Sequence, residues 1–229
     1  MEASGALGLV LGVDPALLSI VRLSLVVSAS ATLLAALLGF PLGALVALSR
    51  FPGRSLVIVV LNGLMGLPPV LAGLAIYMLL SRSGPLGSLG ILFTPRAMVV
   101  AQALLVLPII AALARQVVED LWSEYRDELT ALEAGPLLRM TTLLWDARFS
   151  LLTMLLAGFG RAAAEVGAVM MVGGNIDGFT RVMTTSIALE TSKGNLELAI
   201  GLGIVLLAVI VLVNALAWSI GRWAGQHAG

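Results

Sequence analysis

Five long apolar stretches divide the chain, and shorter polar segments separate them. A helix of about 20 apolar residues is long enough to cross the hydrocarbon core of a bilayer, which is about 30 Å thick. The pattern therefore predicts an all-α integral membrane protein with five transmembrane helices in a single domain, residues 1–229. The five predicted spans are residues 15–48, 55–80, 96–117, 149–172 and 196–220.

Turn-forming residues mark several ends of these stretches. Asp14 is a typical N-cap residue and Pro15 suits the first helical position, which predicts a helix start there. A basic turn at residues 49–54 ends the first stretch, and a Gly-Pro pair at 84–85 ends the second. The preceding segment, Met1–Val13, lacks the basic n-region of a signal peptide, so we expect a short external or interfacial segment.

The composition supports a membrane location. Of the 229 residues, 59% are hydrophobic and 11% are charged, whereas soluble domains typically contain about 25% charged residues. The 13 basic and 13 acidic residues balance, so nothing indicates a nucleic-acid surface. Cysteine is absent and the single histidine, His227, lies near the C-terminus, which argues against a catalytic or metal site.

The segment 119–148 is polar, yet it keeps apolar residues at helical spacing. We expect an amphipathic hairpin of short helices, broken at Gly135 and Pro136, that does not span the membrane. Its acidic residues are Glu119, Asp120, Glu124, Asp127, Glu128, Glu133 and Asp146. Its periodic apolar residues are Leu121, Tyr125, Leu129 and Leu132.

Five spans place the two termini on opposite sides of the membrane. With the N-terminus outside, seven basic residues fall on the cytoplasmic side and five outside, in agreement with the positive-inside rule. We therefore expect the hairpin and the C-terminus in the cytoplasm and the loop 173–195 outside. The two sets are Arg50, Arg54, Arg115, Arg126, Arg139, Arg148 and Arg222 inside, and Arg22, Arg82, Arg96, Arg181 and Lys193 outside.

Two features inside the spans bear on function. Pro68 and Pro69 remove helical hydrogen bonds, which fits either a packing kink or a helix shaped around a translocation path. Arg161 and Glu165 share a helix face, and an unpaired charge at that depth is costly, so we expect an ion pair. Because Glu165 would repel an anion, we interpret it as structural. For Arg161, a structural role and a pore-lining role remain equally open.

The segment after the fourth stretch contains hydrogen-bond donors. Asn175, Arg181, Thr184 and Thr185 could donate to an oxyanion, although an ordinary capped surface loop has the same composition. No phosphate-binding Gly-x-x-x-x-Gly-Lys-Ser/Thr run occurs, and the only lysine is Lys193. If ATP drives transport, another chain must therefore bind the nucleotide.

The run 127–135 resembles the coupling loop of ABC-importer permeases, in which a short helix docks into a groove of the ATPase. Asp127 stands at the acidic position, Glu128 and Leu129 replace small residues, and Glu133 replaces the usual glycine. Further runs, including Leu-Pro-Pro-Val-Leu-Ala-Gly-Leu at 67–74, are similar to permeases of the molybdate, tungstate and sulfate group, most of all to the tungstate branch. The others lie within residues 80–87, 159–168 and 173–185.

The resemblance implies a type I-like ABC importer permease for a tetrahedral oxyanion, tungstate or molybdate, with no enzymatic activity of its own. It implies a homodimer in the inner membrane of a bacterium or archaeon, two cytoplasmic ATPase subunits that bind ATP and magnesium, and an external binding protein. The implied ATPase-coupling residues are Asp127, Glu128, Leu129, Leu132, Glu133 and Gly135. The implied path or gate residues are Pro68, Pro69, Arg161, Asn175, Arg181, Thr184 and Thr185.

Two other classes of function remain open on the sequence. A secondary carrier often contains internal repeats and ionisable residues at the bilayer midplane, but no repeat is visible and only Arg161 and Glu165 are candidates. The other class is a membrane scaffold without transport activity or an intramembrane enzyme. The absence of cysteine and of an intramembrane Ser/His or Asp pair argues against the enzyme.

Overall fold

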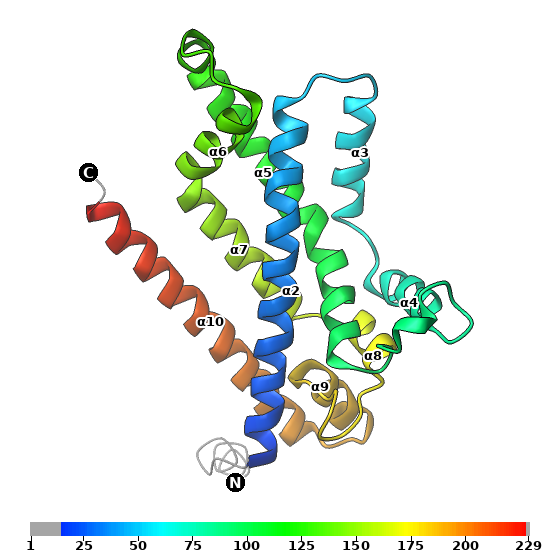
Figure 1. Ribbon diagram of the computed structural model, residues 1–229. Coiled ribbons are helices and arrows are strands. Elements are labelled where there is room, and N and C mark those ends of the chain that lie inside the picture. Colours follow the sequence, from blue (N-terminus) through cyan, green and yellow to red (C-terminus); the bar gives the residue numbers. More distant parts are fainter. Residues whose placement is uncertain (1–14, 228–229) are drawn as a thin grey trace.

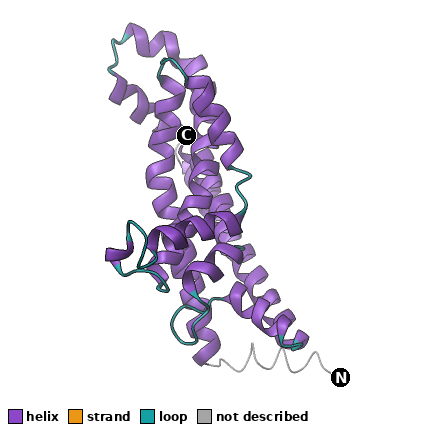
Figure 2. Cartoon of the chain, turned by 90° about the vertical axis from the view of Figure 1, so that its right-hand side faces the viewer, coloured by secondary structure: helices purple, strands orange, loops and turns teal. Residues whose placement is uncertain are grey.

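The computed structural model describes residues 15–227, with side chains over 17–216 and at positions 218 and 219. Within this part the chain consists of helices and connecting loops, without a strand (Figure 2). The predictions for Met1–Val13 and for the Asp14 cap lie outside the described residues, as do the side chains of Arg222 and His227.

Three of the helices are long and apolar enough to cross a membrane, namely α2, α5 and α10. The pairs α3–α4 and α6–α7 meet the same test together but are bent by 103° and 72°. The described residues therefore contain three to five candidate spans, which agrees with the predicted all-α membrane protein. The elements are α2 (Pro15–Leu48), α3 (Arg54–Leu64), α4 (Pro69–Leu80), the 3₁₀ turn η1 (Gly87–Leu89), α5 (Pro95–Ala131), α6 (Pro136–Asp146), α7 (Arg148–Ala163), α8 (Gly167–Gly173), α9 (Met183–Ser192) and α10 (Leu196–His227).

The centre of the molecule is the parallel pair α2 and α5 (Figure 1). Their backbones approach closely at Gly43, where a Cβ atom would lie 2.4 Å from the Ala111 carbonyl oxygen and 2.8 Å from the Arg115 nitrogen. One turn earlier, a Cβ atom on Gly39 would lie 2.9 Å from Cγ2 of Ile110. Small residues four apart allow such contact between helices in a membrane. This contact fixes the two longest helices of the core against each other.

The other helices attach to this pair. On one side lie α3, α4 and α8, and on the other lie α7 and α10 (Figure 1). In its most apolar stretch, α10 has only 17% of its residues buried, whereas the corresponding stretch of α5 has 67% buried. Ile200, Ile204 and Leu207 are among its exposed side chains. Because the protomer leaves this apolar surface uncovered, α10 fits contact with lipid or with a second copy of the chain.

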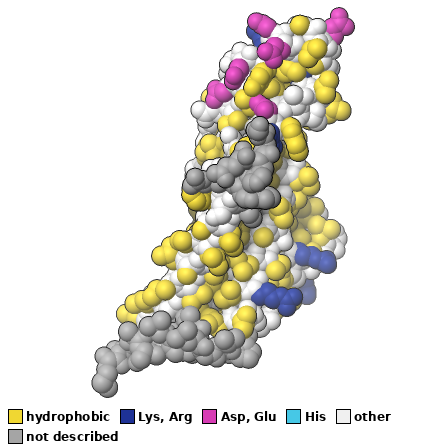
Figure 3. All heavy atoms as spheres, turned by 90° about the vertical axis from the view of Figure 1, so that its left-hand side faces the viewer, with side chains coloured by type: hydrophobic (Ala, Val, Ile, Leu, Met, Phe, Trp, Pro, Cys, Tyr) yellow, Lys and Arg dark blue, Asp and Glu magenta, His cyan; other side chains and the backbone are white. Residues whose placement is uncertain are grey.

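Different elements form the two ends of the molecule (Figure 1). The hairpin end comprises the turn 49–53, the α5–α6 hairpin and the C-terminal part of α10. The distal end comprises the N-terminal part of α2, the loop 81–94 and α9. On the face that Figure 3 shows, acidic side chains gather at the hairpin end and a group of basic ones lies nearer the distal end.

Three predicted segments differ from the structure. The stretch 55–80 is not one helix, because α3 ends at Leu64 and Pro69, which lacks an N–H, starts α4. The stretch 149–172 is interrupted at residues 164–166, between α7 and α8. The third stretch does not end near Val117: α5 continues to Ala131, so the first half of the hairpin is the end of a long helix rather than a short separate one.

Replacing Gly43 by alanine should destabilise the protein, because the new Cβ atom would meet backbone atoms of α5 that cannot move aside as a flexible side chain can. We expect a loss of about 1–3 kcal/mol, measured as a lower thermal midpoint of the detergent-solubilised protein. Gly203→Ala on α10 is the matched control, since no atom lies within 4 Å of its added Cβ. Equal midpoints for Gly43→Ala and the wild type would contradict the close contact.

Candidate functional site

The turn between α5 and α6 is a Schellman motif. The Ala134 N–H donates to the Leu129 carbonyl at 3.0 Å, and the Glu133 N–H donates to the Thr130 carbonyl at 3.0 Å. Glu133 has a φ of 50°, in the left-handed region that glycine adopts most easily. Gly135, with a φ of −68° as N-cap of α6, needs no such freedom. The glycine usual at position 133 in the resembling loops thus has a physical explanation.

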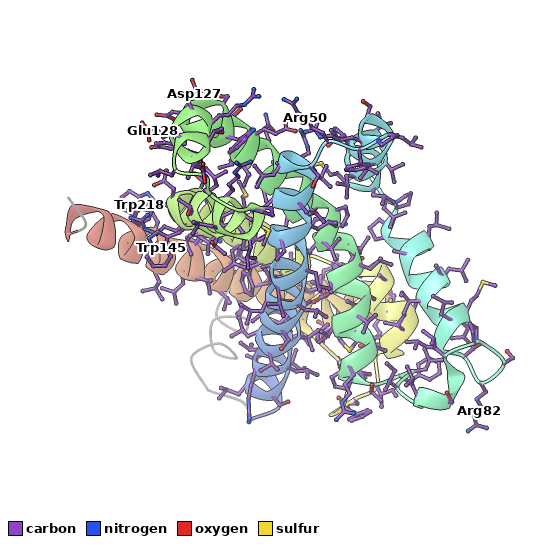
Figure 4. All side chains as sticks on the ribbon, turned by 45° about the horizontal axis from the view of Figure 1, so that its top comes forward. Arg50, Arg82, Asp127, Glu128, Trp145 and Trp218 are labelled. Carbon is purple, nitrogen blue, oxygen red and sulfur yellow. The ribbon has the colours of Figure 1, made fainter. Side chains whose placement is uncertain are left out.

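The outer face of the hairpin is apolar, with acids beside it. Leu132 is 76% exposed, and Leu137 and Leu138 at the start of α6 are 69% and 57% exposed. Asp127 and Glu128 project from the last turns of α5 at the outermost part of this end (Figure 4). An exposed apolar face of this kind is typical of a surface that binds another protein.

Leu129 does not belong to this outer face, although the sequence resemblance implied it as a coupling residue. It is 8% exposed and packs in a cluster with Ala44, Val118 and Leu143. Because α5 is still helical at position 129, it directs this side chain toward α2 and α6. Leu129 therefore supports the hairpin from inside.

A charged network connects the hairpin stem to the preceding helices. The Arg54 Nε donates to the Val46 carbonyl at 2.8 Å, near the end of α2. The same guanidinium pairs with Glu119 on α5, and Glu119 also pairs with Arg115. Sequence reasoning missed the Arg54–Glu119 pair because 65 positions separate the two residues. The spacing of Arg115 and Glu119, four positions apart, was the only local signal of this network.

Buried polar groups support the break between α7 and α8. The Arg161 Nη1 donates to Glu165 Oε2 at 2.7 Å, and the Ala168 N–H donates to Glu165 Oε1 at 3.1 Å. The side chain of Glu165 is 3% exposed and that of Arg161 is 34% exposed. The Gln102 Nε2 donates to the Ala162 carbonyl at 2.9 Å. Both carboxylate oxygens of Glu165 thus accept hydrogen bonds from neighbouring protein groups.

The hydroxyls of Thr184 and Thr185 are used within the protein. The Thr184 Oγ1 donates to the Glu165 carbonyl at 2.8 Å, and the Thr185 Oγ1 donates to the Val182 carbonyl at 3.0 Å. Both residues are buried, at 6% and 0% exposure. In this conformation they hold α9 in place and present no free proton to a substrate.

The remaining predicted path residues belong to other elements than Arg161. Pro68 and Pro69 form the start of α4, and Asn175, with a φ of 49°, turns the chain after α8. Arg181 lies at the distal end, where its Nη1 donates to Asp177 Oδ1 at 2.8 Å. The structure brings Arg161, Glu165 and Thr184 together around one helix break. The start of α4, which Pro69 forms, packs against the same break, since a Cβ atom on Gly167 would lie 3.7 Å from the Val70 nitrogen and 3.8 Å from Glu165 Oε1.

A second local ion pair lies at the end of α9. The Lys193 ammonium donates to the Glu190 carboxylate at 2.8 Å, and this hydrogen bond holds the pKa of Glu190 below its ordinary value. The Asn195 amide donates to the other carboxylate oxygen at 3.2 Å. Glu190 is therefore ionised and internally paired at neutral pH.

No protein-family model matches the chain. It is 44% identical over 207 residues to the "Probable anion ABC transporter permease protein" of Haloferax volcanii, which covers 87% of this chain and 88% of that protein.

Two further relatives have the same printed name, tungstate uptake system permease protein TupB. The protein from Peptoclostridium acidaminophilum is 41% identical over 215 residues, with 94% of each chain covered. The protein from Campylobacter jejuni is 34% identical over 217 residues, which covers 95% of this chain and 91% of that protein. At such identity over nearly the whole length, this multi-pass inner-membrane protein belongs to the family of ABC transporter permease proteins for anion uptake.

Proposed function

We propose that this protein is the permease subunit of an ATP-driven importer for a tetrahedral oxyanion, with tungstate as its substrate and molybdate as the next candidate. The observation that carries the proposal is the identity of 41% and 34% to two proteins named as tungstate uptake permeases. More distant relatives are named as sulfate and molybdenum transport permeases, at 31% and 27% identity. All of these names fit one class of substrate.

The proposed transporter contains two copies of this chain, two ATPase subunits and an external binding protein. The uncovered apolar surface of α10 supports a second copy or lipid beside the protomer. ATP and magnesium bind to the ATPase subunits, because this chain has no phosphate-binding loop with its lysine. ATP hydrolysis then belongs to those partners.

The hairpin end faces the cytoplasm in this proposal, and the N-terminus lies outside. Among the described residues, six arginines lie at the hairpin end and five basic residues lie at the distal end. The positive-inside rule places the end with more basic residues in the cytoplasm. This orientation presents Leu132, Leu137 and Leu138 to a cytoplasmic ATPase. Asp127 and Glu128 flank that contact.

The proposed mechanism is alternating access driven through the hairpin. Closure of the ATPase pair moves the hairpin, and α5 carries this displacement because it is one continuous helix of 37 residues. The breaks at 65–68 and 164–166 are the joints at which α4 and α8 change their angle to the core. Pro68, Pro69 and the Arg161–Glu165 pair act at these joints rather than as tight ligands.

ATP-dependent uptake tests the proposal directly. In proteoliposomes, this chain with its ATPase and binding protein should accumulate tungstate only when ATP is present on the ATPase side. Molybdate should compete more strongly than sulfate. Tungstate uptake by the purified chain alone, driven by an ion gradient, would instead identify a secondary carrier.

Replacing Leu132 by aspartate should uncouple the transporter, because this exposed side chain lies at the centre of the proposed ATPase contact. We expect loss of ATPase co-purification and of uptake with an unchanged thermal midpoint. Leu89→Asp, at a 58% exposed leucine of the distal end, is the matched control and should keep ATPase binding. Normal uptake by Leu132→Asp would refute docking through this face.

Replacing Glu133 by glycine should stabilise the hairpin by about 1 kcal/mol, because a left-handed residue with a Cβ atom is strained. Uptake should be retained. The same change at Glu128, which is helical, should destabilise by about 1 kcal/mol. Thermal midpoints of the two variants test this, and a fall in the midpoint for Glu133→Gly would contradict the assigned motif.

A further inference from the structure

We propose that Arg22 on α2 and Arg181 before α9 form a binding site for the oxyanion at the distal end of the chain. The inference rests on the proposed oxyanion function and assigns the first contact of the substrate with this protomer. The proposed site binds the anion before translocation. Neither the hairpin nor the helix breaks provide such a site.

A cavity of about 320 Å³ lies between α2 and the segment 178–181. A cavity of this size is large enough for a five-atom oxyanion. The residues that line it include Ser19, Arg22, Val26, Gly178, Phe179 and Arg181.

The charges of the cavity favour an anion. Arg22 is exposed and forms no ion pair with any carboxylate in the described part of the chain. Arg181 is 23% exposed and pairs with Asp177, which is itself 79% exposed. Among the described residues, no acceptor reaches the Nε of Arg181. Two arginines therefore line the cavity and only Arg181 is paired with a carboxylate, and their planar donors match the oxygens of an oxyanion.

Hydrogen bonds hold the wall of the cavity in place. The Thr180 Oγ1 donates to the Gly173 carbonyl at 2.6 Å and accepts the Ile176 N–H at 2.9 Å. The Met183 N–H donates to Ser24 Oγ on α2 at 2.8 Å, which ties the start of α9 to the opposite wall. Arg181 thus projects from a fixed segment, and binding costs little reorganisation.

The surrounding charge directs anions to this end. Among the described residues, the distal end has five basic side chains against three acidic ones, whereas the hairpin end has six against seven. Such an asymmetry raises the local concentration of an anion at the distal end. The acidic residues of the distal end are Asp177, Glu190 and Glu197, of which Glu190 is paired with Lys193.

The decisive experiment measures tungstate uptake in proteoliposomes that contain the complete transporter. Arg22→Gln and Arg181→Gln should each raise the KM for delivered tungstate about tenfold, which corresponds to about 1.4 kcal/mol of lost binding free energy. ATPase co-purification and kcat should be unchanged. Arg96→Gln removes the same charge at the same end, outside the cavity, and should leave the KM unchanged.

The variant Asp177→Asn distinguishes a role of Arg181 in binding the anion from a purely structural ion pair with Asp177. It releases Arg181 from a competing carboxylate, so the KM should fall. A lower thermal midpoint with an unchanged or raised KM would instead identify the Arg181–Asp177 pair as structural and overturn the site.

A lipid phosphate group presents the same charged oxygens to the two arginines as a free oxyanion does. Two membrane compositions distinguish these two ligands. With neutral phosphatidylcholine only, the arginine variants should still raise the KM. If they do so only with anionic phosphatidylglycerol present, the cavity binds a headgroup. If they abolish capture of the binding protein, the arginines form a docking surface, and the site is overturned. Absence of uptake by the wild-type complex refutes the proposed function itself.

Discussion

The close contact of α2 with α5 is the constraint on which the rest of the structure depends. Glycine at positions 39 and 43 allows the two helices to approach so closely that a Cβ atom at either position would collide with α5. In a bilayer there is no hydrophobic driving force between helices, so this packing must hold them together. The helices that form the distal end and the hairpin are then positioned by one rigid pair, and a force on the hairpin acts on the whole protomer.

Breaks in the membrane helices require polar support, and this protein provides it from within. Backbone groups freed in lipid must find partners inside the protein. At the α7–α8 break these partners are Gln102, Glu165 and Thr184. Thr184, a candidate donor to the substrate on the sequence, is thus hydrogen-bonded to the backbone. The proposed anion contacts, Arg22 and Arg181, lie at the distal end instead.

The long apolar stretch and its flanking turn residues predicted the bounds of α2, but apolar content could not reveal breaks. The stretch 55–80 is apolar throughout, and its two prolines indicate an interruption without indicating the 103° angle. Leu129 and Leu132 were indistinguishable on the sequence because both fit one helix face. The helix ends at Ala131, so Leu132 belongs to the turn and points outward. Long-range pairs such as Arg54 with Glu119 leave no trace in local spacing.

The central claim is that the hairpin lies in the cytoplasm and receives the force of a separate ATPase. Because the chain contains no cysteine, single-cysteine variants report its topology without a background. Glu128→Cys at the hairpin and Ser83→Cys at the distal end are both at exposed positions. In intact cells a membrane-impermeant maleimide should label position 83 and should label position 128 only after lysis. Labelling of position 128 in intact cells would contradict the account.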